Sequence, residues 1–274
     1  MQKRFISKIK IGYKNAEDIF VLFALLNAIG YDDENNDKGM YPMRKRVRKQ
    51  LSAVDWKEKY PQCKNLLKEY HPGWLLLDAL KKRETAKPPK IQKVLEQIKN
   101  DLLMRKLWNE YKSDQKRECE EMLPIFKEEI SSIVDFIGVM PKNINTLALA
   151  INPLDVYWRG YGLAVKETGY IIIGPGNKQQ KRNVMRHELM HILAPKIAIP
   201  QNILEHPKNK VLAKMGYSTK SVLNREYVVR AVQIAYEVEI LKKDLEQALL
   251  EEPEFPKIKE AVEFVQMKIK RRPL

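Results

Sequence analysis

The chain has 274 residues, of which 44% are hydrophobic, and its 50 Lys and Arg outweigh 35 Asp and Glu to give a formal net charge of +15. This length and apolar content suit one large or two small domains with a buried core and exclude a disordered chain. The positive charge attracts polyanions unless acidic patches cancel it. Because it is spread over both halves, with one dense cluster at Arg44–Lys49, we expect only weak, non-specific binding of nucleic acid.

The apolar run of residues 19–30 follows two acidic residues. It is shorter than the about 20 residues that a membrane span needs and has no small-residue cleavage site. We therefore expect a buried helix, capped by Asn15 and ended by Gly30, and no membrane span.

The two cysteines, Cys63 and Cys119, lie far apart and match no metal-binding spacing. This pattern indicates neither a disulfide framework nor a cysteine zinc site. It favours two free thiols in a reducing compartment, so we predict a cytoplasmic protein.

Residues 1–140 read as a succession of helices without a strand pattern, with amphipathic stretches at 90–112 and 113–137. Residues 146–153, 155–165 and 169–176 are instead short segments rich in β-branched and aromatic residues, separated by turn residues. We predict an α+β fold, predominantly helical, with a small and mostly antiparallel sheet. The expected organisation is a helical N-terminal region, 1–140, followed by a second region, 141–274.

A helix expected at residues 180–193 carries the motif HELMH, in which His187 and His191 are four residues apart and Glu188 follows the first histidine. On an α-helix this spacing puts both imidazoles on one face, where they can bind one metal ion. Glu188 is rotated by about 100° from His187 and can reach a water on that ion without replacing a ligand. Two further helices are expected, at about 221–251 and 257–270.

In this motif the chain resembles the zincin metallopeptidases, whose HExxH helix follows a sheet with a substrate-aligning edge strand. The resemblance covers VMRHELMHIL closely and the strands before it loosely. It implies a zinc-dependent peptidase for peptide or protein substrates, with His187 and His191 as zinc ligands and Glu188 as general base. Residues 1–140 match no zincin motif.

A catalytic zinc needs a third protein ligand. The metzincin extension is absent after His191, and in gluzincins this ligand is a glutamate on a downstream helix. We expect it to be Glu226, because NREYVVRA departs from the recurrent NExxxxA only by the inserted Arg225. The alternative role for Glu226 is an ordinary ion pair with Arg230. The other ligand candidates are Glu205, Glu237, Glu239 and His206.

An oxyanion stabiliser is also expected near the metal. We favour Tyr227, which directly follows Glu226, while Tyr217, Tyr161 and Arg159 are alternatives. A rival hypothesis from another class is a basic polyanion-binding or regulatory protein with a structural or vestigial metal site, in which Arg44–Lys49 contact the polyanion.

Overall fold

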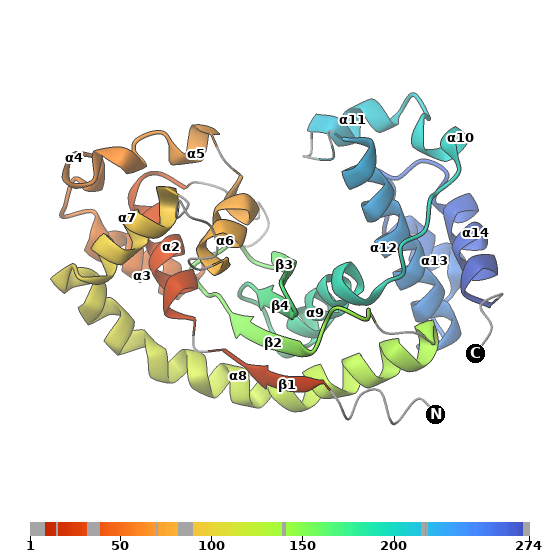
Figure 1. Cartoon of the computed structure of the whole chain (residues 1–274), viewed down its shortest axis with the longest axis horizontal. Coiled ribbons are helices and arrows are strands. Elements are labelled where there is room, and N and C mark those ends of the chain that lie inside the picture. Colours follow the sequence, from red (N-terminus) through yellow and green to blue (C-terminus); the bar gives the residue numbers. More distant parts are fainter. Residues whose placement is uncertain are drawn as a thin grey trace. The chain divides into compact units, whose positions relative to one another are not determined.

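The computed structural model describes residues 9–14, 16–31, 39–69, 71–81, 90–138, 141–214, 217 and 219–270 (Figure 1). Helices predominate in it, and the strands form one small mixed sheet. The predicted α+β class is therefore confirmed.

The described part of the chain divides into two compact units. The first, here the sheet unit, comprises Ile11–Phe126 and Thr146–Met185; the second, here the α12 unit, comprises Lys127–Asn145 and Arg186–Leu274 with the N-terminal residues up to Lys10. The expected boundary at residue 140 stays a prediction.

The sheet has the strand order β1-β2-β4-β3. The three later strands lie within the predicted segments, but β2 pairs with β4 in parallel while β3 pairs with β4 antiparallel. The sheet is thus mixed, where a mostly antiparallel one was expected. The first strand was missed, although Ile9, Ile11 and Tyr13 alternate with Lys10 and Gly12 in the way that indicates a short strand. The strands are β1 (Lys10–Tyr13), β2 (Thr146–Ile151), β3 (Gly160–Val165) and β4 (Thr168–Ile173).

The core of the sheet unit is built around α2 (Glu17–Ala28), the helix predicted from the first apolar run. It is apolar on every side, as expected for a helix that others surround, and it contacts α3, α6 and α7. Gly30 follows its end with a φ of 107°, which suits glycine; Asn15, the expected cap, lies outside the described residues. The other helical elements that begin in this unit are α3 (Pro42–Leu51), α4 (Trp56–Lys59), η1 (Pro61–Cys63), α5 (Leu66–Glu69), α6 (Pro72–Leu80), α7 (Lys90–Lys99), α8 (Leu102–Ile137) and α9 (Lys178–Leu193).

The α12 unit is organised by α12 (Lys220–Glu239), which packs against α13 (Leu245–Leu250) and α14 (Ile258–Lys270) (Figure 1). The helix predicted at 221–251 is therefore two helices. The break falls at Lys242, which has a φ of 59° and so leaves the helical region. The end of α9, from Arg186, belongs to this unit, as do the short helices α10 (Gln201–Leu204) and α11 (Asn209–Lys214).

A buried ion pair joins the end of α8 to α9 within the α12 unit. Arg186 donates from Nε and a terminal nitrogen to the two carboxylate oxygens of Glu129, over 2.9 and 3.1 Å. The side chains are 5% and 0% exposed. The Arg186 guanidinium also lies over the ring of Tyr236 on α12, whose hydroxyl bonds Ser132 on α8. Three helices are thus linked directly beside His187.

We predict that Arg186→Met lowers the free energy of unfolding by about 3–5 kcal/mol, because it deprives a buried carboxylate of its bidentate partner. Urea unfolding of the metal-free protein measures this. Arg117→Met is the matched control: its pair with Asp114 has 66% and 40% exposed side chains, so the loss should stay below about 1 kcal/mol. Adding Glu129→Leu to Arg186→Met should restore part of the stability. Equal losses in the two single variants would contradict this account.

Candidate metal centre

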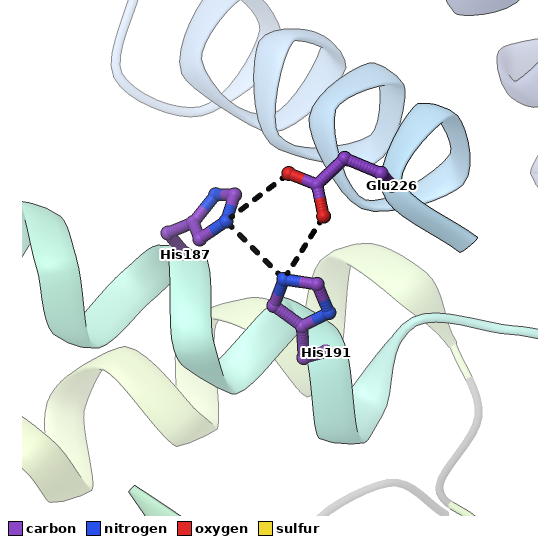
Figure 2. Close-up of side chains that lie close together, drawn as sticks. All are labelled: His187, His191 and Glu226. Carbon is purple, nitrogen blue, oxygen red and sulfur yellow. Dashed lines mark hydrogen bonds and ion pairs between the residues drawn. The ribbon is translucent and has the colours of Figure 1, made fainter. Parts of the chain in front are cut away.

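The two histidines of the HExxH motif lie side by side on one face of α9 (Figure 2). The Nε2 atoms of His187 and His191 are 3.2 Å apart, and the ring centroids are separated by 4.9 Å. This is the arrangement expected of residues four positions apart on a helix. Both imidazoles therefore present the same nitrogen to one point in space.

Glu226 on α12 completes the cluster with its carboxylate (Figure 2). Its Oε1 lies 3.7 Å from Nε2 of His187, and its Oε2 lies 3.5 Å from Nε2 of His191. Its side chain is only 6% exposed. Among the described residues, these three form the one group of His, Cys, Asp or Glu side chains whose ligand atoms come close enough to share an ion.

The spacing of these atoms fits zinc. Ligands at about 2.0–2.1 Å from a tetrahedral ion lie about 3.3 Å from one another. The two imidazole nitrogens are 3.2 Å apart, while the 3.7 and 3.5 Å contacts to Glu226 are made by different oxygens of its carboxylate. With one ligand atom from each residue, the three atoms lie within 4.8 Å of one another. Two imidazole nitrogens and one carboxylate oxygen are also a ligand set that catalytic zinc uses, with a fourth position left to water.

The surroundings favour the neutral, metal-binding form of both imidazoles. Burial lowers the pKa of His187, although the charge of Glu226 opposes this shift. Burial lowers the pKa of His191 well below its ordinary value, with further lowering from the charges of His187, Arg225 and Arg230. Nitrogen lone pairs are therefore available at neutral pH.

Arg225 fastens the helix that carries Glu226 to the end of the helix that carries the histidines. Its guanidinium donates to four backbone carbonyls at the end of α9, those of Met190, His191, Ala194 and Pro195, over 2.6–3.3 Å. The carbonyl of His191 is one of the last in α9, which lack partners within the helix, while that of Met190 also accepts from the backbone of Ala194. Arg225 thus caps the end of α9 and binds the two residues after it. Arg225, the residue by which NREYVVRA departs from the gluzincin pattern, thus links the start of α12 to the end of α9 directly before Glu226.

The alternative role considered for Glu226, an ion pair with Arg230, is present as well. Arg230 Nε donates to Oε1 of Glu226 over 2.9 Å, and its guanidinium also pairs with Glu252. Arg230 is 16% exposed at its side chain, so this is not a surface pair. The charge-assisted bond orients the carboxylate while its oxygens face the histidines.

The remaining ligand candidates lie outside the cluster. Glu205 has a 56% exposed side chain and meets Lys220, and Nδ1 of His206 accepts a turn hydrogen bond from the backbone of Lys208. Glu239 pairs with Gln266 and Lys270. Glu237 lies on the same face of α12 as Glu226 but bonds Gln233 and Lys243 instead.

Of the expected catalytic side chains, Glu188 occupies the position beside His187 on α9 and is 8% exposed. Tyr227 is not brought to the cluster: it is fully buried, and its hydroxyl bonds Asn209 and the carbonyl of Pro256. Tyr217 is linked to the cluster indirectly, because its phenol is hydrogen-bonded to Arg230, which also bonds Glu226. Burial, followed by the charge of Glu226, raises the pKa of Tyr217.

The other two stabiliser candidates, Tyr161 and Arg159, belong to a buried network of the sheet unit. The Tyr161 hydroxyl donates to Oδ2 of Asp155 over 2.8 Å, and Arg159 donates to the hydroxyl of Tyr31 over 2.8 Å. Tyr31 in turn donates to Oδ1 of Asp155. These contacts connect the segment before β3 to Tyr31, which follows α2. Tyr161 and Arg159 therefore have a structural role.

The basic cluster Arg44–Lys49 is only partly available to a polyanion. Arg44 is fully buried, and it donates to Oδ1 of Asn27 over 2.7 Å and to the carbonyl of Tyr31 over 2.9 Å. Lys45, Arg46 and Lys49 are exposed on α3. The rival hypothesis of a polyanion site therefore rests on fewer charges than the sequence offered.

The chain matches no protein-family model, and neither curated proteins nor solved structures give a significant match. Within the described part of the chain, no helix has the length and apolar character needed to cross a membrane. Cys63 and Cys119 are buried and free of disulfide bonds.

We predict that Glu226→Ala lowers the affinity for zinc by more than about 100-fold, the upper end of the loss from removing an outer-shell partner. Glu205→Ala, which removes an exposed candidate of the same type, should leave the affinity unchanged. Competitive titration against a zinc-binding dye measures both, with circular dichroism as the control for folding. A larger loss of zinc affinity in Glu205→Ala than in Glu226→Ala would instead identify Glu205 as the third ligand.

Proposed function

We propose that this chain is a zinc-dependent metallopeptidase that hydrolyses peptide bonds. The observation that carries the proposal is the convergence of His187, His191 and Glu226, which each offer one ligand atom within 4.8 Å of the others. The support is chemical and geometric: the HExxH spacing supplies two ligands and a carboxylate base, and a separate helix supplies the third ligand.

Zinc bound there would lower the pKa of a water toward about 7 and polarise a scissile carbonyl. Glu188 is the group proposed to take the proton from that water as it attacks. The same carboxyl then delivers the proton to the leaving amine, so the base is restored after each turnover. Its position directly after His187 on α9 suits this role, because it lies beside the ligands without being one of them.

For the hydroxyl donor to the developing oxyanion we propose Tyr217 in place of Tyr227. The Tyr227 hydroxyl is held by two acceptors inside the unit, whereas Tyr217 is hydrogen-bonded to Arg230, the residue that also holds Glu226. A donor attached to the ligand network is better placed to meet charge that develops near the metal.

We predict that Glu188→Gln keeps zinc bound but lowers the rate of peptide hydrolysis by about 10²–10⁴-fold, the usual contribution of a general base. Elemental analysis gives the zinc content, and cleavage of a quenched-fluorescence peptide library gives the rate. Glu205→Gln makes the same change at an exposed site and should leave both unchanged.

Two outcomes would contradict the proposal. The first is a Glu188→Gln variant that retains zinc and the full rate. The second is a fully zinc-loaded parent protein that cleaves neither the library nor an unfolded protein substrate.

A further inference from the structure

A polar stripe runs along α12 beyond the proposed ligand. Gln233 and Glu237 follow Glu226 by seven and eleven residues. Because each residue of an α-helix turns by about 100°, both side chains leave the helix axis within about 20° of the direction of Glu226. Gln233 Oε1 lies 2.9 Å from Nδ1 of His187, and Gln233 Nε2 lies 2.9 Å from Oε1 of Glu237. One face of α12 thus presents Glu226 to the cluster and Gln233 to Nδ1 of His187, the ring nitrogen that does not face the cluster.

The direction of hydrogen bonding along this stripe follows from the chemistry of its members. Glu237 acts as an acceptor at both oxygens, because Gln233 donates to Oε1 and the Lys243 ammonium donates to Oε2 over 3.0 Å. The amide nitrogen of Gln233 must therefore face Glu237, and its oxygen must face His187. An amide oxygen only accepts, so Nδ1 of His187 carries the hydrogen.

We infer that Gln233, held in place by Glu237, is a positioning residue that selects the Nδ1–H tautomer of His187. In that neutral tautomer Nε2 carries the lone pair, and Nε2 is the atom that faces Glu226 and His191. The ring cannot rotate without breaking the bond to Gln233, so the same contact sets its orientation. The consequence for zinc rests on the proposed function, whereas the tautomer belongs to the metal-free chain and can be measured there.

The contacts from His187 through Gln233 to Glu237 are here called the relay. Charged residues around the relay make it possible to bury the Glu237 carboxylate. The Glu237 side chain is only 10% exposed, and its charge is met by Lys243 and, at 4.0 Å, by Arg186. A buried carboxylate without such partners would be costly. Arg186 is already held by Glu129, so the relay is anchored to α8 as well as to α12.

The test uses protein labelled with ¹⁵N-histidine and freed of metal by chelation. Nitrogen chemical shifts identify the protonated ring nitrogen of His187, and its signals are assigned from single substitutions at the other histidines. We expect the Nδ1–H tautomer in the parent chain and a mixture of tautomers in Gln233→Leu, which removes the acceptor. Zinc affinity should fall by about 10- to 100-fold in that variant, as for other partners of metal-binding histidines.

Two further variants make the test specific. Gln266→Leu deletes an equivalent amide of the same unit, one that bonds Glu239 and not a histidine, and should change neither tautomer nor affinity. The exchange Gln233→Glu with Glu237→Gln keeps an acceptor facing His187 and a donor behind it, so it should restore both. A merely structural role for Gln233 would not move the tautomer.

Gln233→Leu with an unchanged tautomer would overturn the inference, and so would an exchange variant that behaves like Gln233→Leu. A parent chain that shows the Nδ1–H tautomer but binds no zinc would contradict the proposed function and leave the role of Gln233 standing.

Discussion

The attachment of α12 to the end of α9 is the constraint on which the candidate site depends. Two histidines on a single helix fix only two ligand positions, and the third has to come from elsewhere to within a few tenths of an ångström. Arg225 accomplishes this by binding four carbonyls at the end of α9 while Glu226 follows it on α12. The same side chain therefore bonds the end of one helix and precedes Glu226, the proposed ligand, on the other.

The second constraint is the cost of burying two carboxylates on α12. The side chains of Glu226 and Glu237 are 6% and 10% exposed, and the neighbouring face of α12 packs into the core of its unit. Each is matched by cations: Arg230 holds Glu226, while Lys243 and Arg186 meet Glu237. Such networks are tolerated when every member is satisfied. The stripe is thus a set of interdependent contacts, and the loss of one weakens the others.

Local patterns in the sequence were sufficient for much of the site. The four-residue spacing of the histidines depends only on helix geometry, and the stripe of Glu226 and Glu237 on α12 follows from the same periodicity. Strands β2, β3 and β4 were recognisable from β-branched residues between turns. Each of these features could be predicted because the residues that indicate it lie within a single short segment of the sequence.

Features that depend on contacts between distant segments were missed. Nothing in RKRVRK distinguishes Arg44, which is buried against Asn27 and Tyr31, from the exposed charges beside it. Likewise, Arg225 looked like a departure from a family pattern, and Tyr227 followed Glu226 in sequence although adjacent helical residues point about 100° apart. The parallel pairing of β2 with β4 is also a tertiary choice that the segments alone do not encode.

The claim that His187, His191 and Glu226 form one zinc site is tested most directly by X-ray absorption at the zinc edge on the reconstituted protein. The account predicts one zinc per chain, with nitrogen and oxygen neighbours at about 2.0–2.1 Å and the outer-shell scattering of two imidazoles. A chain that retains no zinc after reconstitution, or a spectrum without imidazole scattering, would contradict it.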